Sequence, residues 1–281
     1  MLKLGRLTAA LAAAVISFSL IPSSQACTIW AARGEGVTEN GHTIAVQIYD
    51  WKNLVDVSIK SGFGSGYDVY GIYPRAQFVH GINEKGLFVA SASAPSNLQG
   101  NKLPWVSTVG NRRPHEEIAR TCGTVDEALK RTDIFNYGYP NFFLLADKDE
   151  IALVEALPDG THIVSRTKKG FRVHTNHFCM KETYQRFKVN HNSDTVVRLK
   201  RIRQLLKESP RPMSFEDFIA FSKDHDAGDD KSLFNERSQG VLIADIAPDG
   251  KVRMYQRVRK NPLNRNSEWV EEIFDLRERI K

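Results

Sequence analysis

The sequence predicts a layered α+β fold in which two antiparallel sheets lie between layers of helices. Two long series of strand-like segments, joined by tight polar turns, are separated by pairs of helical segments. The plausible stack is therefore helices, sheet, sheet, helices. The composition, with 41% hydrophobic and 26% charged residues, is that of an ordinary globular protein. Because the chain has no internal repeat and no linker rich in Pro or Ser, residues 27–281 are expected to form one domain.

Residues 1–26 have the pattern of a secretory signal peptide. Lys3 and Arg6 provide a positive start, an apolar run follows, and small residues, Ser24 and Ala26, stand where a leader peptidase reads. The apolar run is short for a membrane span, which needs about 20 apolar residues. We therefore expect an exported protein, periplasmic or secreted, that has no stable membrane span and begins at Cys27 once the leader is removed.

A Cys directly after a leader also occurs where a bacterial lipoprotein carries its lipid. Such sites usually have Leu three residues before the Cys, and this chain has Ser24 there. Lipid anchoring at Cys27 is the alternative to a free mature amino terminus.

Strands are expected first at the mature amino terminus. Residues 27–32 and 42–51 form a predicted hairpin, and further strands are expected at 55–62 and 78–93, the last with a turn at 83–86. The Gly-rich segment that follows the third strand is expected to edge a pocket as a loop. Its apolar contacts would come from Phe63, Tyr67 and Tyr70.

The second series of strands follows the first helices. A meander of four strands is predicted at residues 142–146, 151–156, 161–165 and 172–175. A last hairpin joins 240–246 to 251–258 around Pro248-Asp249-Gly250.

Helices are predicted at 114–122, after Thr124, at 194–207 and after Ser214. Thr124 with Glu127 and Ser214 with Asp217 have the spacing of capping boxes. Four basic residues of the third helix are most simply its solvent-facing side: Arg198, Lys200, Arg201 and Arg203.

The net charge of +6 comes from basic residues scattered along the chain. The sequence has no basic stripe with interleaved aromatic residues, so a nucleic-acid partner is not expected. The three cysteines are an odd number for an exported protein. A bridge between Cys122 and Cys179 would leave Cys27 free, but we favour two buried, unbridged thiols at those positions. Trp30 and Trp51 are expected in the core.

An amino-terminal cysteine carries its own base. A thiol is a weak nucleophile until its proton is removed, and a free α-amine, whose pKa is about 7.7–8.0, can accept that proton. While the leader is attached, the same nitrogen belongs to a peptide bond and cannot act. Cys27 is therefore a candidate nucleophile that leader removal switches on.

Several motifs in matching order resemble one enzyme family over essentially the whole mature chain. They are Cys27-Thr28-Ile29-Trp30, Tyr49-Asp50-Trp51, the G-x-N-E-K-G-L turn at 81–87, the segment 141–155 and the TNHF signature at 175–178. The chain resembles the choloylglycine hydrolase and penicillin V acylase family, with its isopenicillin N acyltransferase relatives. These are N-terminal nucleophile (Ntn) hydrolases with Cys.

The resemblance implies a four-layer αββα fold and a set of catalytic residues. Cys27 would be the nucleophile, Asp50 would orient its thiol or amine, and Asn176 would donate to the oxyanion. Arg237 lies near the late active-site Arg of the family and would shape the surroundings of the sulfur.

Two positions depart from the bile-salt and penicillin V branch. Gln47 stands where that branch has Arg, and Ser93 where it has Asn or Tyr. A backbone N–H at Ser93 could still serve the oxyanion hole. The departures argue against a bile-salt hydrolase and leave the acyl group open.

The expected function is hydrolysis of a linear, non-peptide amide of a small-molecule substrate through an acyl-thioester on Cys27. An acyltransferase, in which an amine replaces water, is the first alternative, and a lipid-anchored binding protein is the second. No cofactor is expected. The spacing of His174, His177 and Cys179 resembles a metal site but lacks a second ligand pair, so no metal is expected. Members of this superfamily often assemble, which makes a homo-oligomer an open expectation.

Overall fold

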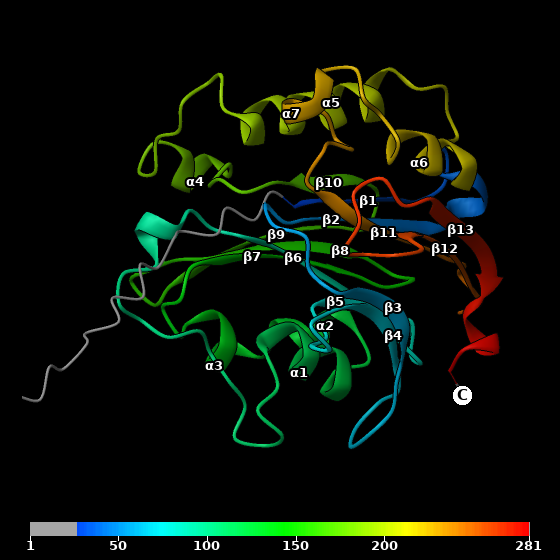
Figure 1. Cartoon of the computed structure of the whole chain (residues 1–281). Helices are drawn as coiled ribbons and strands as arrows, with labels where there is room; N and C mark the ends of the chain where they lie inside the picture. The colour runs from blue at the N-terminus through cyan, green and yellow to red at the C-terminus, as the bar shows by residue number, and fades with distance from the viewer. Residues whose placement is uncertain (1–26, 281) are drawn as a thin grey trace, which may run out of the picture.

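The computed structural model describes residues 27–280, which form two antiparallel sheets packed face to face between helices (Figure 1). The predicted leader, residues 1–26, lies outside the described residues. The six-stranded sheet runs, in spatial order, through β10 (Gly170–His174), β1 (Thr28–Arg33), β2 (Thr43–Asp50), β11 (Ser238–Ile246), β12 (Val252–Arg259) and β13 (Trp269–Asp275). The seven-stranded sheet runs through β3 (Val57–Gly62), β4 (Val69–Pro74), β5 (His80–Asn83), β6 (Phe88–Ser93), β7 (Asn141–Ala146), β8 (Ile151–Ala156) and β9 (His162–Thr167).

Helices cover the outer face of each sheet (Figure 1). The seven-stranded sheet carries α1 (Pro114–Thr121), α2 (Val125–Leu129) and α3 (Thr132–Phe135). The six-stranded sheet carries α4 (Lys181–Tyr184), α5 (Asp194–Glu208), α6 (Phe215–Phe221) and α7 (Gly228–Lys231). Short 3-10 turns lie at Glu39–Gly41, Ser96–Leu98 and Leu276–Glu278. The α+β class and the αββα layering predicted from the sequence are confirmed.

The core has three layers, one between the sheets and one under each helix layer. On β1, Ile29 and Ala31 face the space between the sheets, while Trp30 and Ala32 face α5 and α6. Successive side chains of a strand point to opposite faces, so both faces of β1 are buried and its central residues, Ile29 to Ala32, are all apolar. On the other outer face, Phe143 and Ile118 belong to the layer under α1–α3.

The predicted hairpins at both ends of the chain are confirmed. β1 and β2 pair with Thr28 opposite Ile48, which brings the start of β1 beside the end of β2. β11 and β12 pair around the predicted turn, and β11 also pairs with β2. The end of β2 is therefore bordered by the beginnings of both β1 and β11.

The prediction of a four-stranded meander is wrong in its last strand. β7, β8 and β9 pair in order, but β10 leaves their sheet and pairs with β1, with Ile29 opposite His174. β1 would otherwise be an edge strand with one row of unpaired backbone groups buried inside the fold. The crossing places the segment after β10 beside the start of β1.

Two strands, β4 and β13, were not predicted from the sequence. The prediction of a pocket-edging loop after β3 is wrong, because part of that segment forms β4. Tyr70 is a buried strand residue whose hydroxyl donates to Oε1 of Gln256 at 2.7 Å. The Gly-rich segment is the β3–β4 turn and packs on α1, where a Cβ at Gly66 would lie 2.3 Å from the carbonyl oxygen of Arg120. Phe63 is 65% exposed and is not among the cavity-lining residues described below.

The capping predictions hold fully at one helix and in part at another. Ser214 and Asp217 form a reciprocal capping box at α6. At α2 the Thr124 hydroxyl accepts from the Glu127 N–H, but the Glu127 carboxylate accepts from Gly123 instead of Thr124.

All three cysteines are free thiols. Cys122 lies under α1–α3 and Cys179 packs on the other outer layer, so the unbridged interpretation is confirmed. Within residues 27–280, no helix combines the length and apolar character that a membrane crossing requires.

Candidate active site

Cys27 lies at the start of β1, buried between the two sheets with 1% of its surface exposed. Its Sγ is 3.9 Å from the carbonyl oxygen of Asp50. Burial, followed by the charge of Asp50, raises the pKa of the Cys27 thiol to about 12. At neutral pH this thiol is protonated, so a base is needed to turn it into a nucleophile.

Asp50 ends β2 and is fully buried beside Cys27. Its two carboxylate oxygens accept from the Ser238 hydroxyl at 2.6 Å and from Nδ2 of Asn235 at 3.1 Å. The pairing of β11 with β2 shifts register between Ser238 and Gly240, and this irregularity aims Ser238 at the carboxylate. Burial raises the pKa of Asp50 to about 6, while Arg198 and the two donors limit the rise.

Asn176 follows β10 and reaches the same region from the other side. Its Nδ2 donates to the Ser93 carbonyl oxygen at 3.0 Å, and its backbone N–H donates to the Thr195 hydroxyl at 2.8 Å. A carboxamide nitrogen has two hydrogens, and Ser93 uses one of them. The other is available to a substrate oxygen.

Arg198 connects these groups, and its predicted place on the wet side of α5 is wrong. It is 0% exposed. Nη1 donates to the Cys27 carbonyl at 2.9 Å and to the Thr28 hydroxyl at 2.6 Å, and Nη2 donates to Oδ1 of Asn176 at 3.1 Å. Asp194, one turn earlier, accepts from the same guanidinium at 3.3 Å.

A signal for this position was present in the sequence. Thr195, Arg198, Leu199, Ile202 and Leu206 follow the three- and four-residue spacing of one helix face, and all are buried. A basic residue inside such a stripe faces the protein, whereas Lys200 lies on the exposed side.

Arg237 does not contact Cys27, whereas the resemblance implied a place next to the sulfur. Its Nη2 donates to Asp194 at 2.9 Å and to the Asp230 carbonyl, and its Nε is 3.3 Å from Oδ1 of Asn235. Within residues 27–280 its hydrogen bonds do not include Cys27. It contacts Asn235, which donates to Asp50, and its charge is one of the influences that lower the pKa of Asp50.

Gln47 and Ser93 both lie at the site. Gln47 is fully buried on β2, and a hydrogen bond from its side chain is one of the influences that lower the pKa of Cys27. Its Oε1 is buried and has no hydrogen-bond partner among the described residues. Ser93 contributes its carbonyl oxygen to Asn176, and the oxyanion role of its N–H stays a prediction.

A cavity of about 300 Å³ shares Ser93 with this group, whereas Cys27, Asp50 and Asn176 are not among its described lining residues. Tyr49 and Ser93 form part of its wall, and Tyr49 stacks on Trp51 with ring centroids 6.4 Å apart. Trp51 is therefore half-buried: it lines the cavity and packs against the edge of the core between the sheets, whereas Trp30 is fully buried as predicted.

The structure groups Glu155, His174 and Cys179, with donor atoms within 4.8 Å of one another, and leaves His177 out. His174 bonds the Thr175 carbonyl through Nδ1 at 2.6 Å and Glu155 through Nε2 at 2.8 Å. Although burial lowers it, the neighbouring Cys179 and Glu155 raise the pKa of His174 to about 10. The cluster is thus a buried ion pair between β8 and β10, just before Asn176.

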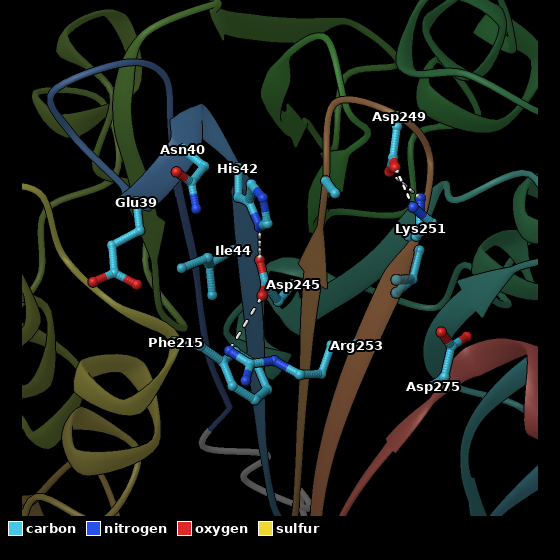
Figure 2. Close-up of a pocket in the computed structure, with 12 residues that line it drawn as sticks. Glu39, Asn40, His42, Ile44, Phe215, Asp245, Asp249, Lys251, Arg253 and Asp275 are labelled. Carbon is cyan, nitrogen blue, oxygen red and sulfur yellow. Dashed lines mark hydrogen bonds and ion pairs between the residues drawn. The ribbon is translucent and has the colours of Figure 1, made fainter.

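A second cavity, of about 450 Å³, lies at the other end of β2 (Figure 2). There His42 bonds Asp245 at 2.7 Å, and Asp245 also pairs with Arg253 (Figure 2). Among the described residues that line it there is no Cys, Ser or Thr. It lies about 25 Å from Asp50 along the strand, so it is separate from the Cys27 site.

A family model agrees with the motifs. The family model described as acyl-coenzyme A:6-aminopenicillanic acid acyl-transferase matches residues 37–261. This span begins after Cys27 and includes Asp50, Asn176 and Arg198. Among solved structures the chain is similar to penicillin V acylase from Agrobacterium tumefaciens, with 15% identity over 87% of this chain and 86% of that one and a TM-score of 0.49. A search of curated proteins found no match. By the family model, the chain belongs to the acyl-coenzyme A:6-aminopenicillanic acid acyltransferase family, one of the Ntn-type families that its motifs predicted.

Proposed function

We propose that this protein is an exported Ntn-type amidohydrolase that is cut before Cys27 and cleaves a linear, non-peptide amide through a thioester on that residue. The observation that carries the proposal is the environment of the buried Cys27 at the start of β1: its Sγ lies 3.9 Å from the Asp50 carbonyl oxygen, and its own carbonyl oxygen shares the Arg198 guanidinium with the side chain of Asn176.

The reaction begins with transfer of the thiol proton to the α-amine of Cys27, directly or through one water. Sγ then forms a bond to the substrate carbonyl carbon, and the free Nδ2 hydrogen of Asn176 stabilises the oxyanion. The ammonium returns its proton to the leaving nitrogen as the C–N bond breaks. Water, activated by the same amine, attacks the thioester and releases a carboxylic acid with the regenerated thiol.

The electrostatics of the site support a role for leader removal. While residue 26 is attached, the Cys27 nitrogen is a peptide nitrogen, and burial keeps the pKa of the thiol at about 12. A free α-amine, whose pKa is about 7.7–8.0, supplies the missing base. Because the pKa of Asp50 is about 6, its carboxylate is mostly ionised at neutral pH and can hold the ammonium formed during catalysis.

An acyltransferase reaction is the second candidate, favoured by the description of the family. It shares every step up to the thioester and differs only in the acceptor, which is an amine in place of water. A lipid anchor at Cys27 has less support, because an anchor residue must reach a membrane surface and Cys27 is buried between two sheets.

The test compares the chain that starts at Cys27 with the full chain, both carrying Cys122→Ser and Cys179→Ser so that Cys27 is the only thiol. We expect hydrolysis of members of an acyl-amide panel, one alkylation by iodoacetamide and loss of activity for the short chain. The full chain should be folded but inactive.

Cys27→Ser in the short chain should lose turnover, because a hydroxyl is harder to deprotonate than a thiol. Full activity after complete alkylation, or in Cys27→Ser, would remove Cys27 as the nucleophile. A diacylglycerol adduct in the mass of the exported protein would favour the anchor instead.

A further inference from the structure

The cavity lined by Tyr49 and Ser93 extends to Pro114 and His115 at the amino end of α1, and Cys27 itself is not among its described lining residues. Tyr49 connects the two regions: it shares the inter-sheet core with Cys27, and its ring lies 5.9 Å from that of His80. The His80 ring in turn lies 5.9 Å from the ring of His115, and both tyrosine and histidines line the cavity. Ser93 gives a second link to the Cys27 site, because it lines the cavity and its carbonyl oxygen accepts from Asn176.

The far end of the cavity carries an unpaired positive charge. Arg113 lines it, and no Asp, Glu or Lys is among the described lining residues. The neighbouring arginines all have carboxylate partners: Arg112 and Arg131 pair with Glu117, and Arg120 pairs with Glu116. Within residues 27–280, Arg113 forms no ion pair and no side-chain hydrogen bond.

His115 adds unused hydrogen-bonding capacity at the same place. Both of its ring nitrogens are buried and form no hydrogen bond of ordinary geometry among the described residues, although the nearby Phe78 backbone has a small raising influence on the pKa of His115. Burial, and then the charge of Arg113, lower the pKa of His115 to about 3, so the ring is neutral and one nitrogen carries a hydrogen. A buried donor without a partner is costly, and an acceptor on a ligand would satisfy it.

The first turn of α1 also favours an anion at this end of the cavity. Arg113 is its N-cap and provides no side-chain cap, and Pro114 occupies the first helical turn. The N–H groups of such a turn favour a negative charge. Glu116 and Glu117 already lie in this turn, but each pairs with an arginine and neither lines the cavity. Pro114 and His115 both line the cavity, so this helix end borders it.

The rest of the wall is uncharged, with large apolar side chains beside polar ones such as Gln77 and Asn141, and the space is small. Trp51, Trp105, Ile134 and Phe143 contribute to the lining. A volume of about 300 Å³ lies at the lower end of the range for small-molecule sites.

We propose that this cavity binds the acyl half of the substrate, and that the acyl group is short and ends in a carboxylate held by Arg113, His115 and the amino end of α1. This assignment rests on the proposed function, since it places the scissile carbonyl at Cys27. It also excludes acyl groups that end in a cation.

A binding experiment tests the anion site without catalysis. The chain starting at residue 27 with Cys27→Ala is titrated calorimetrically with glutarate and with pentanoate, which differ in the second carboxylate. We expect glutarate to bind about 10- to 100-fold more tightly, the range for hydrogen bonds to a charged group. Arg113→Gln should remove this difference and Arg113→Lys should keep part of it. Arg277→Gln, which removes an exposed charge elsewhere, should leave the difference in affinity between glutarate and pentanoate unchanged.

A kinetic experiment tests the link to Cys27. The 4-nitroanilides of glutaric and pentanoic acid are compared with the chain starting at Cys27, and Arg113→Gln should lower the glutaryl-to-pentanoyl ratio of kcat/KM by about 10- to 100-fold. If pentanoate binds as tightly as glutarate, or if Arg113→Gln leaves both ratios unchanged, the carboxylate assignment is overturned.

The two proposals fail in different ways. Cleavage of both anilides at a ratio independent of Arg113 would overturn the carboxylate site and leave the hydrolase standing. Binding of glutarate that depends on Arg113, together with absence of acylation at Cys27 by any amide, would overturn the hydrolase and, with it, the acyl-pocket assignment.

Discussion

Arg198 donates from Nη2 to the side-chain oxygen of Asn176 at 3.1 Å, while its Nη1 donates to the carbonyl of Cys27 at 2.9 Å. One buried guanidinium thus joins the candidate nucleophile to the candidate oxyanion donor. A guanidinium can only donate, so the oxygen of the Asn176 amide must face Arg198 and the nitrogen must face Ser93 and the reacting carbonyl. Arg198 is therefore a positioning residue for Asn176.

Arg198→Lys should lower kcat more than it changes KM. Lysine keeps the charge but lacks the planar fork, and it cannot hold Cys27 and Asn176 at once. We expect a loss in kcat of about 10-fold or more, measured together with urea unfolding. Arg201→Lys, one turn along α5 and paired with Asp224, is the matched control. A folded Arg198→Lys protein with unchanged kcat would contradict the positioning role.

Asn176→Ala should lower kcat by about 10²- to 10³-fold, because it removes one oxyanion donor from a buried site. The protein should stay folded, as judged by circular dichroism, and Cys27 should still be alkylated. Asn192→Ala, at an exposed position on the same connection, provides the comparison. Wild-type kcat in folded Asn176→Ala would remove the side chain from the oxyanion hole.

The acid limb of the pH profile should report Asp50. Burial raises the pKa of this carboxyl to about 6, so kcat/KM should fall as the pH drops through that value and the carboxylate is protonated. Asn235→Ala removes a hydrogen bond that lowers this pKa, and should therefore move the acid limb to higher pH. An acid limb that stays in place in folded Asn235→Ala would assign it to another group.

The ion pair of His174 with Glu155 should make stability depend on pH above neutrality. The pKa of His174 is raised to about 10, so the stabilisation is fully present below about 6.5 and is lost as the pH rises through about 10. The free energy of unfolding in urea should decline over this window in the wild type. The decline should be smaller in the double variant His174→Gln/Glu155→Gln, which replaces both charges.

Removing only one partner of the His174–Glu155 pair should lower the free energy of unfolding more than replacing both. Glu155→Gln alone leaves a buried imidazolium without its anion, and the cost of breaking a buried pair is about 3–5 kcal/mol. If the free energy of unfolding falls equally steeply with pH in the wild type and in the double variant, His174 does not titrate in this window.

Local patterns predicted most of the secondary structure, because strand alternation, turn residues and caps act within a few residues. Ser214 and Asp217 satisfy each other three positions apart, and the β11–β12 hairpin closes around its own turn. The pairing of β10 could not be found this way, since its partner β1 lies more than 130 residues earlier in the chain.

The same division applies to the candidate site. Sequence motifs alone identified Cys27, Asp50 and Asn176, because the chemistry of an amino-terminal thiol and the order of the motifs are properties of the chain itself. Only the tertiary structure decided that Arg198 contacts Cys27 and that Arg237 contacts Asn235 instead. Which face of α5 is buried, and which of two basic residues reaches the nucleophile, depend on the packing of that helix against β1 and β10. Packing brings together groups that are more than a hundred residues apart, and no local pattern records it.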